Sequence, residues 1–285
     1  MKITDIINSK KVTLSYEVFP PKKDGNFEPI LSAVDELCAD GPDFMSVTYG
    51  AGGSTGQNTV KVSNYVKSRG VTPLAHLTCI SSGREEIRRE VEELRKNSIE
   101  NVLALRGDIP SEGYVPGDYR YAADLVREIR EMGDFCIGAA CYPDGHVDCP
   151  HKEDDITYLK EKVDSGVDFL TTQMFFDNNV MYNFLYRIRE RGIVVPVIAG
   201  IMPVTKSIHA EKSVKLSGTY LPTRLKNMID KYGDRPLAMR QAGIAFATEQ
   251  IIDLIANGVH CIHIYTMNDP EVAMEIHQNI SEIIR

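Results

Sequence analysis

One glutamate inside a strand-like run is the first candidate for chemistry. Glu17 interrupts the segment SYEVFPP at residues 15–21, where its neighbours are of the kind that pack in a core. An apolar surround favours the neutral form of a carboxyl group, which can then act as a general acid. Pro20 and Pro21 stop the strand directly after it and stiffen its position. We expect Glu17 to be catalytic; the alternatives are a solvent-facing carboxylate and one half of a structural ion pair.

Further polar residues stand in or after other apolar runs. Asp108 follows Arg106 and Gly107, and Gly107 permits a close backbone approach to a ligand. An Arg–Asp pair capping a loop is the alternative there. His76 lies in PLAHLT and Gln173 in TTQMFFD, where a structural histidine and a solvated amide are the alternatives. Each signal is weak alone, and their convergence is what indicates a site.

The elements that must hold these residues are short β-rich runs that alternate with amphipathic helices. Helical patterns such as 84–97 and 154–165 carry apolar side chains on one face. Turns at Gly41, Gly166 and Gly258 close a helix before the next strand. This alternation is typical of βα units on a parallel sheet. The predicted strands are 13–19, 44–49, 73–78, 101–105, 136–142, 169–175, 195–201 and 261–265.

This strand count favours an α/β fold of the (βα)8 TIM-barrel type, as a single domain over residues 1–285. A doubly wound sheet is the main alternative, but it should carry Gly-x-Gly-x-x-Gly after its first strand, where none is present. Pro222 and Pro236 divide the long stretch between strands seven and eight into about three extra helices. Barrel active sites lie at the carboxyl ends of the strands. Polar residues predicted at those ends are Glu17, Thr48, Tyr49, His76, Thr78, Arg106, Asp108, Tyr142, Gln173, Tyr265 and Asn268.

The composition excludes several classes of protein. It is 43% hydrophobic and 25% charged, which argues against disordered and fibrous chains. A net charge of -8 argues against a general affinity for nucleic acid or anionic membranes, so an anionic ligand needs a local cationic site. We find neither a signal peptide nor a membrane span, and expect a cytoplasmic protein. The spacing of Cys136, Cys141, Cys149 and His151 fits no standard zinc pattern, so no metal site is expected.

Eight segments, in this order, resemble the methylenetetrahydrofolate reductase family in its bacterial form, which has only a catalytic domain. The match runs through nearly the whole chain, and it is far more specific than any single motif. The segments are YEVFPP (16–21), SVTYGA (46–51), HLTC (76–79), LRGD (105–108), ACYP (140–143), TQMFFD (172–177), GIMPV (200–204) and YTMN (265–268).

The resemblance implies a ping-pong reduction of 5,10-methylenetetrahydrofolate to 5-methyltetrahydrofolate by NADH or NADPH, through FAD rather than FMN. Glu17 would protonate folate N10, Asp108 would tune the flavin and bind the pterin, and Gln173 would hydrogen-bond the pterin. Tyr265 would also bind the substrate. Arg106 and Lys162 would pair with the pyrophosphate. The residues implied at the FAD are Thr48, Tyr49, Ala51, His76, Arg106, Gly107, Asp108, Tyr121, Ala122, Tyr142, His146, Asp155 and Lys162.

The chain also departs from the family. Tyr158 and Glu161 stand where the family often has Asn and Arg on the FAD-contacting helix. Asp269 replaces an Arg after YTMN, and His209 replaces a Gln at the substrate tail, so tail recognition is expected to differ. Ser213 stands where some members cover the nicotinamide with an aromatic residue, which leaves the electron donor open.

Three functional hypotheses follow from these matches and departures. The first is a self-sufficient NAD(P)H-dependent reductase, which we expect to be a homo-oligomer. The second is a flavoprotein subunit that receives electrons from a partner, either an electron-transfer or a zinc-containing subunit. The third is a non-redox pterin-binding barrel, for which Arg106 and the loop of Tyr142 would have no evident task.

Overall fold

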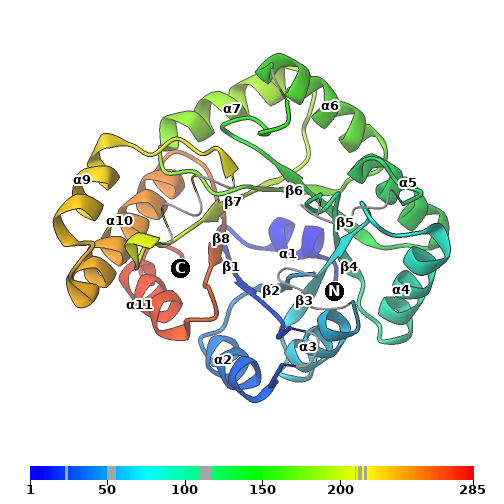
Figure 1. The fold of residues 1–285 in the computed structure, drawn as a ribbon, viewed down its shortest axis with the longest axis horizontal. Helices are drawn as coiled ribbons and strands as arrows, with labels where there is room; N and C mark the ends of the chain where they lie inside the picture. The colour runs from blue at the N-terminus through cyan, green and yellow to red at the C-terminus, as the bar shows by residue number, and fades with distance from the viewer. Residues whose placement is uncertain are drawn as a thin grey trace.

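Eight parallel strands form a closed barrel in which each strand pairs with the next and the last pairs with the first (Figure 1). The computed structural model describes residues 1–22, 25–49, 56–109, 117–149, 151–208, 210, 214 and 217–285. The predicted (βα)8 barrel is therefore confirmed. The strands are β1 (Thr13–Val18), β2 (Phe44–Val47), β3 (Thr72–Thr78), β4 (Asn101–Leu105), β5 (Cys136–Cys141), β6 (Phe169–Thr172), β7 (Val197–Ile201) and β8 (Cys261–Tyr265).

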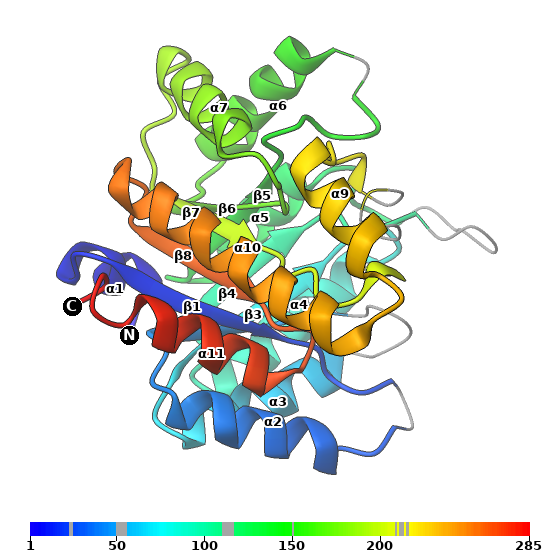
Figure 2. The ribbon, with the colours of Figure 1, turned by 90° about the vertical axis from the view of Figure 1, so that its left-hand side faces the viewer.

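Helices surround the barrel (Figures 1 and 2). Their buried residues are mostly apolar and belong to the core cluster that they share with the strands. The predicted face of one helix is confirmed, because Ile87, Val91 and Leu94 are buried. The described helices are α1 (Ile3–Ser9), α2 (Glu28–Ala39), α3 (Gly56–Ser68), α4 (Arg84–Lys96), α5 (Ala122–Met132), α6 (Lys152–Asp164), α7 (Asn178–Glu190), α9 (Thr223–Tyr232), α10 (Pro236–Ala256) and α11 (Pro270–Ile280).

Extra helices lie between β7 and β8, as predicted. Pro222 is the N-cap residue of α9, and Pro236 is the first residue of α10. Both positions suit proline, because the first turn of a helix does not need its N–H groups. The third helix predicted in this stretch would fall before Pro222, where several residues lie outside the described part of the chain.

Several predicted strands are shorter in the structure, and two of them show a physical reason. The sixth ends at Thr172 rather than at residue 175, since the N–H of Met174 donates to Oε1 of Gln173 at 3.0 Å and so leaves the ladder. The seventh begins at Val197 rather than at residue 195. Pro196 precedes it and has no N–H to donate to a neighbouring strand.

Helix α1 is an element that the sequence patterns did not predict. It lies at one end of the barrel, beside the starts of the strands (Figure 2). Ile3 and Ile6 are buried there in a cluster with inward-facing residues from the first half of the strands, namely Phe44, Leu74, Leu103, Cys136, Phe169 and Ile198. Asn101 fixes the helix, because its Oδ1 accepts from the N–H of Ile3 at 2.9 Å. The N-terminal end of the barrel is thus filled with apolar side chains.

No helix within the described ranges is both long enough and apolar enough to cross a bilayer.

Candidate active site

A cavity of about 1110 Å³ lies at the carboxyl ends of the strands and reaches α5 and α6. The predicted site residues that the structure describes line it, apart from Asn268 and Asp269, although they come from widely separated segments. Ala51, His209 and Ser213 lie outside the described residues. The lining includes Glu17, Thr48, Tyr49, His76, Arg106, Gly107, Asp108, Tyr121, Ala122, Tyr142, His146, Asp155, Lys162, Gln173 and Tyr265. The structure thus brings these residues together, while their individual roles stay predictions.

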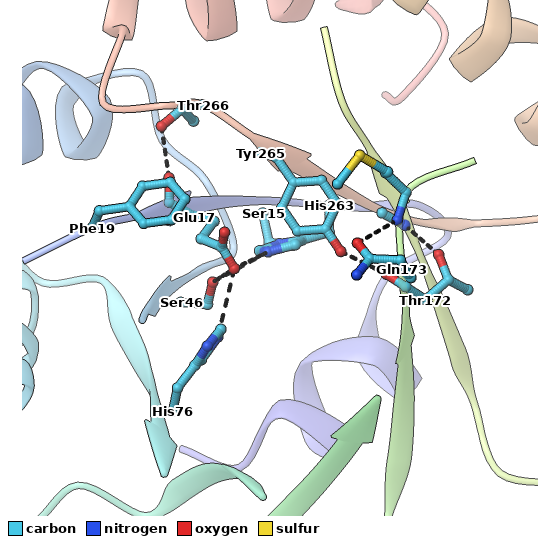
Figure 3. A network of polar contacts seen from close by, with 12 residues as sticks. Ser15, Glu17, Phe19, Ser46, His76, Thr172, Gln173, His263, Tyr265 and Thr266 are labelled. Carbon is cyan, nitrogen blue, oxygen red and sulfur yellow. Dashed lines mark hydrogen bonds and ion pairs between the residues drawn. The ribbon is translucent and has the colours of Figure 1, made fainter. Parts of the chain in front are cut away.

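Glu17 points into the barrel and is buried among polar side chains, not apolar ones (Figure 3). Ser46 Oγ donates to Glu17 Oε2 at 3.4 Å. The Nε2 atoms of His76 and His263 lie 3.7 and 3.9 Å from the same oxygen. The expectation of an apolar surround was wrong because strand side chains alternate in direction. The apolar neighbours in sequence point away from Glu17, and the residues it meets come from other strands.

His263 and Ser46 belong to this cluster and were missed as candidates. Ser15 Oγ lies 2.8 Å from His263 Nδ1, and Ser46 Oγ lies 3.2 Å from His263 Nε2. A hydrogen-bonded series therefore runs from Ser15 through His263 and Ser46 to Glu17. The sequence did hold a signal, since His263 and Tyr265 alternate with isoleucines in β8 and so share its inward face.

Three buried polar atoms on the cavity wall have no hydrogen-bond partner among the described residues: His76 Nε2, Thr48 Oγ1 and Thr171 Oγ1. Burial lowers the pKa of His76 to about 4, although Glu17 opposes the shift, so the imidazole is neutral at physiological pH. A neutral imidazole offers one donor and one acceptor. Unpaired buried polar groups are rare in proteins, and here they indicate that the wall is built to meet a polar ligand.

Tyr265 is held rigidly at the inner wall. Its hydroxyl donates to the carbonyl of Thr172 at 2.5 Å, and its ring meets that of His263 edge-on with centroids 5.4 Å apart. Burial, and then the charge of Glu17, raises the pKa of Tyr265. A Cβ at Gly200 would lie 2.3 Å from the Tyr265 hydroxyl, so this position has to be glycine for the tyrosine to fit.

Asn268 was placed among the strand-end candidates, but it serves the backbone. Its Oδ1 accepts from the N–H of Phe19 at 2.8 Å, and its Nδ2 donates to the Phe19 carbonyl at 3.0 Å. Thr266 Oγ1 donates to the carbonyl of Glu17 at 2.6 Å. The segment after β8 thereby fixes the end of β1 and the acid that it carries (Figure 3).

The loops after β4 and β5 form a charged part of the wall. Arg106 pairs with Asp148 at 2.8 Å, and the backbone of Gly107 is left-handed, with φ of 85°. Asp108 is exposed to the cavity. His146 Nδ1 accepts from the N–H of Asp148 at 3.1 Å, and burial lowers the pKa of His146.

Helix α6 turns one face to the cavity. Asp155, Tyr158, Leu159 and Lys162 follow the i, i+3, i+4, i+7 spacing of a single helix face, and all line the cavity. The Lys162 ammonium donates to the carbonyl of Ala140 at 2.6 Å, and burial lowers the pKa of Lys162. An ammonium group has three N–H donors, so Lys162 can also donate to an anionic ligand while it keeps its bond to Ala140.

In the described part of the chain, no group of three or more His, Cys, Asp or Glu side chains is placed to hold a metal ion. Cys136 and Cys141 stand at opposite ends of β5, and Cys149 donates to the carbonyl of His151 at 3.2 Å.

A closed parallel barrel with a large cavity that holds many polar side chains at the carboxyl ends of its strands is the arrangement typical of (βα)8-barrel enzymes. The family model for methylenetetrahydrofolate reductase matches residues 2–281. The chain therefore belongs to the methylenetetrahydrofolate reductase family.

Three relatives show how the match is distributed. The chain is 35% identical to methylenetetrahydrofolate reductase (NADH) 1 of Zea mays over 99% of its own length, but it spans only 50% of that protein. It is 34% identical to 5,10-methylenetetrahydrofolate reductase of Pectobacterium carotovorum, with 93% of this chain and 89% of the relative covered. For the protein of that name in Escherichia coli K12, the identity is 33%, with 93% and 90% covered. The chain thus spans about half the length of the plant relative and most of the bacterial ones.

Solved structures support the fold. An uncharacterized protein from Clostridium thermocellum, described as binding two copies of 5-methyl-5,6,7,8-tetrahydrofolic acid, superposes with a TM-score of 0.66. The identity is 15%, and 99% of this chain and 100% of the other are covered. At this identity the likeness establishes the barrel and nothing finer.

Proposed function

We propose that this protein reduces 5,10-methylenetetrahydrofolate to 5-methyltetrahydrofolate with NADH or NADPH, through bound FAD in a ping-pong reaction. The substrate gains a hydride at the methylene carbon and a proton at N10, the C–N10 bond breaks, and the nicotinamide is oxidised. The observation that carries the proposal is the convergence of seven of the eight family-like segments on one cavity, which contains a buried carboxyl group and separate cationic groups.

The cavity residues fit a flavin dinucleotide. Thr48 Oγ1, His76 Nε2 and Thr171 Oγ1 lack partners that a heteroaromatic ring system and its sugar-like chain can provide. Arg106 and Lys162 supply positive charge for a pyrophosphate. The volume of about 1110 Å³ exceeds the roughly 300–1,000 Å³ usual for small-molecule sites, as a dinucleotide and a second ring system require. FAD held there would supply the chemistry of hydride transfer between the nicotinamide and the folate.

The residues of the chain perform the remaining tasks. Glu17 holds a proton at a carboxyl oxygen and gives it to folate N10, while Ser46 donates to that carboxyl group and the imidazoles of His76 and His263 lie 3.7 and 3.9 Å from it. The amide of Gln173 and the carboxylate of Asp108 bind the pterin. Tyr265, held by Thr172, forms the wall against which the substrate lies. The apolar cluster at the N-terminal end of the barrel keeps water from reaching Glu17 from that end.

The test is the visible spectrum of the purified protein. We expect a yellow protein whose flavin absorbance bleaches under anaerobic NADH or NADPH and returns on addition of methylenetetrahydrofolate. A colourless protein that takes up no added FAD contradicts the proposal. Heat-treated protein is the control for free flavin, since released FAD still absorbs but is not bleached by the nicotinamide at the same rate.

The electron donor and the assembly state are part of the same proposal. We propose that the isolated chain accepts electrons from free nicotinamide and forms a homo-oligomer. Bleaching by NADH and by NADPH separately gives the preference between them, and sedimentation gives the assembly state. Flavin that is reducible only after a cell extract is added would favour the alternative, a partner protein as electron donor.

A further inference from the structure

An aromatic side chain with no evident structural task lies on the cavity face of α6. Tyr158 lines the cavity and is 60% exposed, whereas Leu159 on the same face is buried. Among the described residues, neither its ring nor its hydroxyl has a hydrogen bond, ion pair or ring contact. A large aromatic surface left in contact with water beside a cavity is the kind of surface that a ligand covers.

A second tyrosine lines the same cavity from the neighbouring helix. Tyr121, the N-cap residue of α5, is 54% exposed. The Asp124 side chain fixes its position by accepting from the Tyr121 N–H at 3.0 Å. The Arg120 guanidinium lies 5.2 Å from the centre of the Tyr121 ring. α5 and α6 lie side by side on the outside of the barrel, on the side away from β1, and each contributes one of the two tyrosines (Figure 1).

A cationic side chain lies beside Tyr158 on the same face of α6. Lys162 stands one helical turn from Tyr158 on the same face, and side chains four residues apart on a helix are neighbours. An anionic group held by Lys162 therefore places the adjoining part of the same ligand at Tyr158. The cavity thus holds an acid on β1, a cationic group on α6, and exposed aromatic rings at the start of α5 and on α6. These groups suit a molecule with one ring system, a linking phosphate group and a second ring.

We propose that Tyr158 binds the purine ring of the flavin dinucleotide by stacking, and that this contact makes the protein select FAD over FMN. The inference rests on the proposed function, because it takes FAD as the ligand. Tyr158 stands where the family often has Asn. An aromatic contact here replaces a polar one.

The experiment compares flavin affinities of the apoprotein. FAD and FMN are each titrated into wild type, Tyr158→Ala and Tyr158→Phe, with flavin fluorescence as the readout. Stacking of a base on an aromatic side chain corresponds to roughly a ten-fold or larger change in affinity. We expect Tyr158→Ala to weaken FAD binding by about that factor and FMN binding by less than about two-fold. Tyr158→Phe keeps the ring and should bind both flavins as wild type does.

A matched control and a second probe separate the possible outcomes. Tyr186→Ala removes a tyrosine that is 64% exposed on α7 and does not line the cavity, so it should change neither affinity. ADP, which lacks the flavin ring, should compete with FAD in wild type and compete about ten-fold less well in Tyr158→Ala.

Equal losses for FAD and FMN, or no loss in Tyr158→Ala, would overturn the inference while leaving the proposed function intact. Wild-type apoprotein that binds neither flavin would instead overturn the proposed function, and the assignment of Tyr158 with it.

Discussion

The same strands carry apolar residues at one end of the barrel and polar residues at the other. At the N-terminal end, inward-facing residues such as Phe44, Leu74 and Phe169 pack with Ile3 and Ile6 of α1 in an apolar cluster. At the C-terminal end, the same strands present a carboxylate, imidazoles and hydroxyl groups, several of them unpaired. Apolar packing supplies stability, whereas unpaired buried polar groups cost stability and are retained for ligands. Substitutions at one end should therefore change stability, and those at the other should change activity.

The largest effect is expected for Glu17→Gln. The amide keeps the size of the side chain and an acceptor for Ser46, but it cannot donate a proton as an acid does. Folate reduction should fall by at least about 100-fold, in the range typical of a lost general acid. Flavin reduction by NAD(P)H should stay within a few-fold of wild type. Stopped-flow measurement of the two half-reactions checks this, and parallel loss of both would make Glu17 a structural residue.

Ile3→Ala tests the other end of the barrel. Ile3 is fully buried, so its truncation leaves a cavity and should lower the free energy of unfolding by about 2–5 kcal/mol. Activity per folded molecule should be unchanged. Urea denaturation gives the first quantity, and Ile7→Ala, at a partly buried position beside the same cluster, is the control with a smaller effect. A loss of activity without a loss of stability would contradict the division between the two ends.

His76 should make stability depend on pH. Its pKa is about 4 in the folded protein against an ordinary value of 6.5, because burial disfavours the imidazolium. The unfolded chain therefore takes up this proton first, and about 3 kcal/mol of stability should be lost as pH falls from about 6.5 to 4. His76→Gln removes the titrating group. As pH falls over that range, the unfolding free energy of wild type should fall steadily relative to that of His76→Gln. If the variant loses stability with falling pH as steeply as wild type does, His76 is not the source of the pH dependence.

The smallest effect is expected at Glu161, which lines the cavity next to the cationic Lys162. Its carboxylate repels a pyrophosphate, so Glu161→Gln should tighten FAD binding by about two- to five-fold at low salt, and by less at high salt. Asp164→Asn, on the same helix but not in the cavity lining, is the control. Weaker FAD binding in Glu161→Gln would show that this carboxylate bonds to the ligand rather than repelling it.

The barrel could be predicted from the sequence because short apolar runs mark the strands, and apolar residues on one face mark the helices between them. The site could be predicted in outline, since polar residues at the ends of parallel strands must converge. The prediction of an apolar surround for Glu17 was wrong, because its polar neighbours Ser46, His76 and His263 come from other strands, which sequence neighbours do not reveal. Helix α1 was missed because its seven residues give too short a pattern, although Ile3 and Ile6 share one face.

The contacts of Thr266 and Asn268 with the end of β1 also determine when the acid becomes usable. The Glu17 carbonyl and the Thr266 hydroxyl that binds it are separated by 249 positions. At typical rates of synthesis, roughly ten seconds to a minute pass on the ribosome between these two residues. During that interval one edge of β1 lacks its partner strand β8, so its backbone groups can pair with another strand. Glu17 is therefore made early and fixed late, and a nascent chain can hold most of the barrel before it has an active site.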